Sequence, residues 1–243
     1  NTILLVNGAE RVTGDEILLG GVFADGEPVF AVRFGTRWSI FKGRTELATA
    51  LASVGGLTVN ALGNACGWVA SDGAGVQSLA CFGAEMAEPW TSLPTQSAQG
   101  LIISPFDPLV AARTFRNGNS TVSYQGAEYP SGRTTGPLSF SHDGALLVYA
   151  GIDGDHFVTI NGKRHWVRGA VDLRAPLVVN TSGTAVAWGS ATTLVYVNLE
   201  LNVLRLGKMV DRMGPVVYDR RTGTFKGLGF VTGRLYLLEC DPR

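Results

Sequence analysis

Three polar residues that precede tight turns are the first candidates for a ligand site. Asn60 and Asn180 each stand three residues before a glycine, and Asp219 stands four residues before one. Amide and carboxylate oxygens are ligands that Ca²⁺ takes in proteins, so these side chains would form a calcium site if the fold gathered them. The same residue types suit a turn, because their side chains hydrogen-bond the backbone two residues on. We favour turn chemistry over metal binding, and no glutamate accompanies the three residues.

Two segments whose tryptophans fall outside the repeated apolar positions of this chain are candidates for ligand recognition. Trp90 lies in the long connection 88–100, and extra loop on a rigid scaffold is where binding often resides. The alternative is that Trp90 covers the edge of a sheet. The second segment could meet an acidic partner or a sugar, or could be a charged edge strand that prevents aggregation. Its residues are Lys163, Arg164, His165 and Trp166.

The remaining reactive residue types do not form a familiar catalytic motif. The three histidines have no zinc-motif spacing, and neither Gly-x-Ser-x-Gly nor a phosphate-binding glycine loop leading into a helix is present. Cys66 and Cys81 flank a predicted hairpin centred near residue 73.5, so they are expected to face each other across two strands. We expect both to be reduced core cysteines, with a disulfide as the alternative. These residues favour a non-enzymatic protein.

Composition points to β structure and argues against an anionic partner. The 243 residues contain 20 Lys plus Arg and 20 Asp plus Glu, so no net charge draws the chain to nucleic acid. Glycine is frequent at 32 residues and charged residues make up only 16%, which is typical of short strands and tight turns. No apolar run approaches the roughly 20 residues of a membrane helix. The chain starts at Asn1 without Met, as expected of a processed form or a fragment of a longer polypeptide.

An internal repeat organises the whole chain. Turn anchors at residues 26, 63, 107, 144, 183 and 223 are 37, 44, 37, 39 and 40 residues apart, close to the ~40–45 of a four-stranded propeller blade. The residues three and five past each anchor are expected to form one buried face, which Lys226 alone breaks. The three-past residues are Val29, Cys66, Val110, Leu147, Val186 and Lys226, and the five-past residues are Ala31, Trp68, Ala112, Tyr149, Trp188 and Leu228.

The best repeat, Leu138-Ser-Phe-Ser-His-Asp-Gly-Ala-Leu-Leu-Val-Tyr149, resembles the WD-repeat-like β-propeller family of the TolB type. The resemblance implies fold more than activity, because members of that group are mostly protein-binding platforms. We therefore expect an all-β, six-bladed propeller of four-stranded antiparallel blades over residues 1–243. The N-terminal stretch 2–8 would complete the last blade. A seven-bladed or incomplete propeller is the alternative.

The expected function is a non-enzymatic binding module that presents residues 86–100 to a protein or a glycan. We expect no cofactor, no nucleic-acid partner and no transmembrane segment, and an extracellular, periplasmic or virion-associated location rather than a cytoplasmic one. The alternatives are a purely structural domain of a larger assembly and a metal-dependent hydrolase. The hydrolase would resemble the six-bladed lactonases and would bind Ca²⁺ at Asn60, Asn180 and Asp219.

Overall fold

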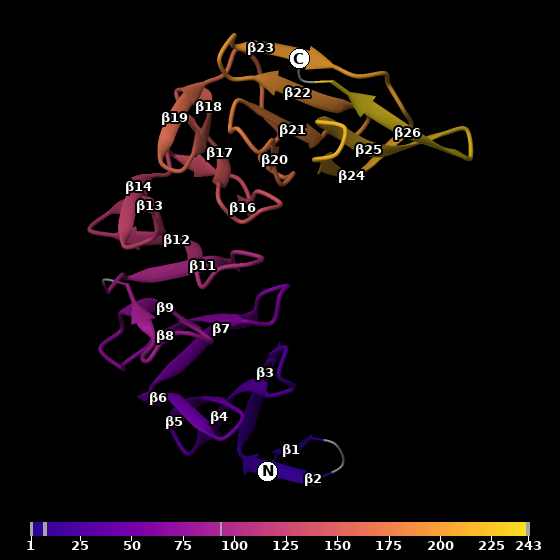
Figure 1. Cartoon of the computed structure of the whole chain (residues 1–243). Coiled ribbons are helices and arrows are strands. Elements are labelled where there is room, and N and C mark those ends of the chain that lie inside the picture. Colours follow the sequence, from indigo (N-terminus) through magenta and orange to yellow (C-terminus); the bar gives the residue numbers. More distant parts are fainter. Residues whose placement is uncertain (1, 7–8, 93, 242–243) are drawn as a thin grey trace. The chain divides into compact units, whose positions relative to one another are not determined.

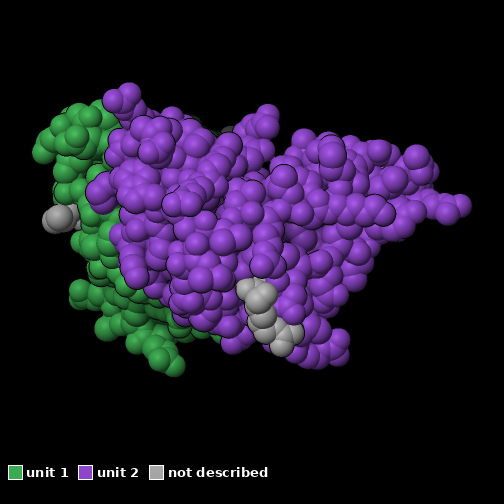
Figure 2. Space-filling model, turned by 90° about the horizontal axis from the view of Figure 1, so that it is seen from above, with its two compact units in different colours: residues 1–129 green, residues 130–243 purple. Residues whose placement is uncertain are grey.

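The chain folds entirely into strands and turns in the part that the structure describes. The computed structural model describes residues 2–6, 9–92 and 94–241, and every regular element within them is a β-strand (Figure 1). The strands fall into two compact units, residues 1–129 and 130–243, coloured separately in Figure 2. No helix suited to crossing a membrane occurs within the described ranges. The all-β prediction is confirmed.

The first unit holds a two-stranded sheet and three four-stranded antiparallel sheets, each built from strands consecutive in the chain. The two-stranded sheet pairs β1 (Thr2–Val6) with β2 (Ala9–Gly14). The four-stranded sheets are β3 (Glu16–Val22), β4 (Pro28–Phe34), β5 (Arg37–Lys42) and β6 (Thr45–Leu51); β7 (Ser53–Val59), β8 (Ala65–Ser71), β9 (Gln77–Gly83) and β10 (Trp90–Thr91); and β11 (Ser97–Ile103), β12 (Val110–Arg116), β13 (Asn119–Tyr124) and β14 (Ala127–Pro130).

The second unit continues the series with five-, four- and three-stranded sheets. Their strands are β15 (Thr134–Thr135), β16 (Ser139–Phe140), β17 (Leu147–Asp153), β18 (Asp155–Ile160) and β19 (Lys163–Trp166); β20 (Val178–Val179), β21 (Ala185–Gly189), β22 (Leu194–Asn198) and β23 (Val203–Leu206); and β24 (Arg212–Asp219), β25 (Thr224–Val231) and β26 (Arg234–Cys240). This succession of antiparallel sheets of about four strands is the blade architecture of a β-propeller.

The predicted buried positions are confirmed in the first five repeats and shifted in the sixth. The residues three and five past the first five anchors are all buried. In the sixth repeat Phe225 is fully buried, whereas Leu228 is 44% exposed. The turn before β25 is one residue longer than the others, so counting from its glycine displaces the pattern by one residue, which exchanges the two faces of a strand. Counting six residues from Asp219 instead gives Phe225.

The N-terminal strand forms a hairpin with the strand that follows it. β1 pairs with β2, with Thr2 opposite Gly14 and Val6 opposite Ala9. The sheet of β24, β25 and β26 contains three strands. That residues 2–8 complete the last blade stays a prediction, and residues 7–8 lie outside the described ranges. Leu4 of β1 packs on Phe30 and Val32 of β4, which gives this hairpin its own small core.

Candidate functional site

Asn60 is held inside the turn that leads into β8. Its side chain is almost fully buried, and its Oδ1 accepts hydrogen bonds from the backbone N–H groups of Asn64 at 3.0 Å and Ala65 at 3.2 Å. Its Nδ2 donates to Oδ1 of Asn64 at 2.7 Å. The amide oxygen therefore serves the backbone of its own turn, as expected of an asparagine at this position.

Asn180 repeats this arrangement in the turn before β21. Its Oδ1 accepts from the N–H groups of Thr184 at 3.0 Å and Ala185 at 3.1 Å, and its Nδ2 donates to the hydroxyls of Ser182 and Thr184. Asn60 and Asn180 therefore occupy the same structural position in two different blades. Each amide oxygen accepts the backbone N–H groups at the start of the following strand, which have no backbone acceptor there among the described residues.

Asp219 stands in the turn before β25, as Asn60 and Asn180 stand in the turns before β8 and β21, but its side chain carries a negative charge. Its Oδ1 accepts from the N–H of Arg221 at 2.9 Å, and its Oδ2 accepts from Nζ of Lys226 at 2.7 Å. The hydrogen bond from Lys226 is the main cause that lowers the pKa of Asp219 to about 2. Within the described residues, no group of three or more His, Cys, Asp or Glu side chains is placed to hold a metal ion.

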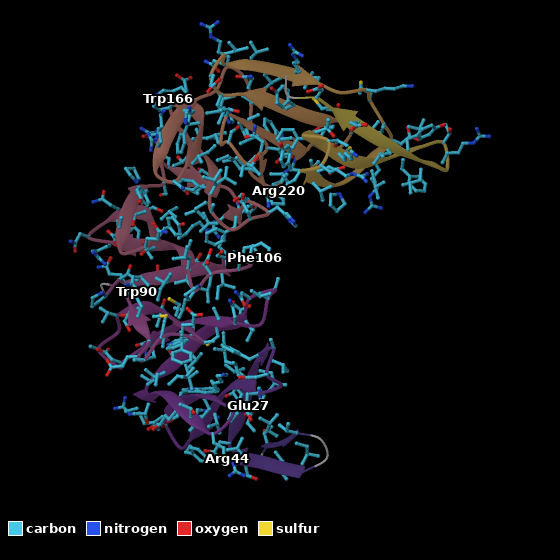
Figure 3. All side chains as sticks on the ribbon, viewed as in Figure 1. Glu27, Arg44, Trp90, Phe106, Trp166 and Arg220 are labelled. Carbon is cyan, nitrogen blue, oxygen red and sulfur yellow. The ribbon has the colours of Figure 1, made fainter. Side chains whose placement is uncertain are left out.

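Trp90 lies at the edge of a blade and lines a cavity of about 270 Å³. It belongs to the two-residue strand β10, where it pairs with Cys81 of β9. The other lining residues come from β9, from the turn after it, and from the next blade: Cys81, Met86, Pro108, Leu109, Val110 and Gln125. Figure 3 labels Trp90, which is half-buried. Trp90 therefore both covers the edge of its blade and lines the cavity.

Residues 86–100 are held by strand pairing and hydrogen bonds, although the sequence suggests a long surface loop. Part of the segment is the fourth strand of one blade, β10, and part is the first strand of the next, β11. Between them Thr95 is buried, exchanges backbone hydrogen bonds with Gln77, and donates its hydroxyl to the carbonyl of Phe115 at 2.7 Å. Leu93 lies outside the described ranges. The long connection is therefore tied to both blades, and the cavity beside Trp90 has anchored walls.

The basic residues of β19 do not form one surface, because successive strand residues point to opposite faces. Arg164 shares a face with Trp166, and its guanidinium lies over the rings of Phe157 at 4.0 Å and Trp166 at 5.3 Å. Arg164 also forms an ion pair with Asp153 at 3.1 Å. Lys163 and His165 lie on the other face, where burial and the charge of Lys163 lower the pKa of His165. Trp166 is 50% exposed (Figure 3).

The two hairpin cysteines lie on opposite faces of their blade, which corrects the predicted register. Cys66 pairs with Phe82, and Cys81 pairs with Gly67. Both are free and buried, as expected. Burial raises the pKa of Cys66 to about 12 and that of Cys81 to about 11. The Cys81 thiol donates to the carbonyl oxygen of Pro108 at 3.0 Å, which links the cavity wall to the next blade.

Three cavity residues were not singled out by the sequence pattern: Pro108, Leu109 and Gln125. Gln125 did leave a signal, since it precedes the glycine of a tight hairpin and adopts a positive φ of 52°. Pro108 follows the anchor Asp107, and only the packing of neighbouring blades brings it to Trp90.

Comparison with known proteins gives similarity in fold alone. No family model matches the chain, and no curated protein sequence matches it. Solved structures that resemble it include an oligogalacturonate lyase in complex with manganese, with 12% identity and a TM-score of 0.49, covering 96% of this chain and 79% of the lyase. TolB from Acinetobacter baumannii has 10% identity and a TM-score of 0.40, with coverages of 93% and 63%. The Cps50 (Swd1) beta-propeller domain of Myceliophteria thermophila has 12% identity and a TM-score of 0.42, with coverages of 92% and 82%.

Proposed function

We propose that this chain is a non-enzymatic binding module and that the cavity beside Trp90 receives an apolar side chain of a protein partner. The observation that carries the proposal is the set of groups around the cavity. Six of the seven lining residues are apolar or weakly polar, and Gln125 supplies one amide. Aromatic side chains at apolar pockets are enriched among the residues that contribute most of the binding energy at protein interfaces.

The chemistry of the lining favours a protein over a glycan. A sugar presents several hydroxyl groups, and each one that loses water on binding needs a hydrogen-bond partner. Of the polar groups near the cavity, the thiol of Cys81 already donates to the carbonyl of Pro108. A cavity of about 270 Å³ is also slightly smaller than the ~300–1,000 Å³ that whole small-molecule ligands occupy. One large apolar side chain fits these conditions better.

A random peptide library displayed on phage, selected against the immobilised chain, provides a direct test. We expect selected peptides to contain a required aromatic or aliphatic residue, and we expect Trp90→Ala to weaken their binding at least about 10-fold, as for a central aromatic anchor. Trp166→Ala is the matched control, because it removes an indole from the exposed edge strand β19. Melting curves establish that both variants are folded.

Two outcomes would contradict the proposal. The first is a set of selected peptides whose binding is equal in the wild type and in Trp90→Ala. The second is a failure to select peptides together with Trp90-dependent binding on an oligosaccharide array, which would identify a glycan as the ligand.

A further inference from the structure

A second cavity lies beside Trp188, within the second unit, and is separate from the cavity beside Trp90. Its volume is about 640 Å³. Residues 169–174, between β19 and β20, form one wall, and residues of the β21–β22 hairpin and of β23 form the others (Figure 1). Among the lining residues, Trp188 is almost fully buried and Leu206 is exposed, so the cavity extends from the interior of the unit to its surface. Every wall belongs to residues 169–206, and the cavity is therefore complete within one unit.

The segment 169–174 is held in place from two sides, so the cavity is preformed. The N–H of Val171 donates to Nδ1 of His156 in β18 at 3.1 Å, and the side chain of Val171 is buried. On the other side, a Cβ added to Gly169 would lie 3.2 Å from Cδ1 of Leu204, which shows that the segment contacts β23 closely. Sites for small molecules are usually preformed in this way, with mostly apolar walls.

The repeat places an equivalent cavity in the first unit. That cavity, of about 330 Å³, lies beside Trp68, which stands five residues past its anchor as Trp188 does. The two cavities share three repeat positions: the tryptophan, its partner across the hairpin, and the residue two places after the tryptophan. These pairs are Trp68 and Trp188, Ala80 and Val195, and Ala70 and Ser190. Only the larger cavity has a hydroxyl group at the third position.

The groups around the larger cavity favour a neutral ligand with one polar group. Arg174 donates to Asp172 through Nε at 3.1 Å and through Nη2 at 3.2 Å, so their opposite charges cancel. The hydroxyl of Ser190 forms no hydrogen bond with another described residue, and Ser190 lines the cavity together with Trp188. The site thus offers an aromatic surface and one hydroxyl group, whereas an ion would lose water without gaining an opposite charge.

We propose that the cavity beside Trp188 binds a neutral aromatic molecule that carries a hydroxyl group. The rings contact Trp188, Val195 and Leu204, and the hydroxyl group hydrogen-bonds Ser190. The volume of about 640 Å³ lies within the ~300–1,000 Å³ of small-molecule sites and is more than twice that of the cavity beside Trp90, so it suits a whole molecule rather than one side chain. An aromatic ligand is favoured because ring pairs gain more than the area that they bury.

2-Naphthol is a suitable probe because it is uncharged near neutral pH and has one hydroxyl group on a fused aromatic ring system. Titration of the full chain with up to about 3 mM probe is followed by methyl NMR, in which Val195 and Leu204 report this cavity, and Leu109 and Val110 report the cavity beside Trp90. We expect saturable shifts at Val195 and Leu204 with a dissociation constant of about 0.1–1 mM, typical of a ligand with about ten heavy atoms. 2-Naphthoate has the same rings with a negative charge and should bind at least about 10-fold more weakly.

Cavity-filling variants test the location. Thr193→Leu adds a side chain to the lining and should raise the dissociation constant at least about 10-fold, because the space for the ligand is lost. Thr192→Leu is the matched control: the same substitution one residue earlier lies outside the lining and should leave the constant unchanged. Ala170→Phe fills the cavity from the opposite wall and replaces Thr193→Leu in the test if melting curves show that Thr193→Leu is unfolded. Ser190→Ala should raise the constant for 2-naphthol about 2- to 12-fold, the loss of one neutral hydrogen bond.

The proposal is overturned if Val195 and Leu204 show no saturable shifts, or if 2-naphthoate binds as tightly as 2-naphthol. It is also overturned if a folded cavity-filling variant, or Ser190→Ala, binds 2-naphthol as the wild type does, or if Thr192→Leu weakens binding as much as the filling variants. Shifts confined to the cavity beside Trp90 would refute this site as well. None of these results decides the peptide test at Trp90, so the two proposals fail separately.

Discussion

The buried turn asparagine Asn180 provides a quantitative test of the structure. In Asn180→Ala, the N–H of Ala185 loses its side-chain acceptor in a buried position, and the N–H of Thr184 loses its acceptor in a partly buried one. A buried donor left without a partner costs about 1–3 kcal/mol, and a partly exposed one costs less. We expect the free energy of unfolding to fall by about 2–4 kcal/mol. Urea unfolding followed by tryptophan fluorescence measures it, since buried Trp188 lies on β21 directly after this turn.

Asp72→Ala is the control for burial. Asp72 also accepts a backbone N–H group through Oδ1, from Ala74 at 2.9 Å, but this bond is exposed. Water replaces the lost acceptor there, so the expected cost is less than about 1 kcal/mol. The explanation is refuted if the two alanine variants lose equal stability.

Asn180→Asp distinguishes a turn acceptor from a metal ligand. An aspartate keeps both acceptor positions for Thr184 and Ala185, so most of the stability lost in Asn180→Ala should return without any added ion. Millimolar calcium should leave the melting temperature of the wild type unchanged. A rise with calcium that is absent in Asn180→Ala would instead identify a metal site, because a ligand that binds only the folded state stabilises it.

Two further predictions concern the packing of β8 and its neighbours. Burial raises the pKa of Cys66 to about 12 and that of Cys81 to about 11. Both thiols should therefore resist iodoacetamide in the folded protein at pH 8, while half-buried Cys240 reacts first. The free energy of unfolding should fall as the pH rises from about 9, where the thiols of the unfolded chain ionise, toward these two pKa values. Gly67→Ala should destabilise the chain by about 1–3 kcal/mol because the new Cβ meets Cγ1 of Val110 on the next blade, and adding Val110→Ala should relieve part of that loss, as a double-mutant cycle in urea will show.

The repeat made much of the fold predictable from local chemistry. Five of the six anchors are glycines with a positive φ, for example 70° at Gly63 and 72° at Gly183, as the tight turns require. The asparagines three residues before these two glycines are held in their turns, where turn propensity places them. Alternation along the second strands then identified buried residues in five repeats. All of these signals depend on residues close together in sequence, so a single sequence reveals them.

The rest depended on packing that no local pattern encodes. The hairpin between β8 and β9 pairs Cys66 with Phe82 rather than with Cys81, because one residue in its turn decides which face each cysteine takes. The cavity at Trp90 required Pro108 from another blade. Leu228 is exposed because the turn before β25 is one residue longer than the others, which moves Phe225 into the buried position.

Each sheet of this chain is made from strands that follow one another directly, so its hydrogen bonds can form as soon as the ribosome has released that portion of the polypeptide. Short loops close at small entropic cost, which favours stepwise maturation from the N-terminal end during synthesis. A truncated product that stops at a blade boundary should keep the earlier sheets intact, with a newly bared hydrophobic side at the cut. Such truncated chains are expected to be folded in their interior and to expose hydrophobic surface only on their last sheet. Chaperones and quality-control proteases would recognise them by that surface.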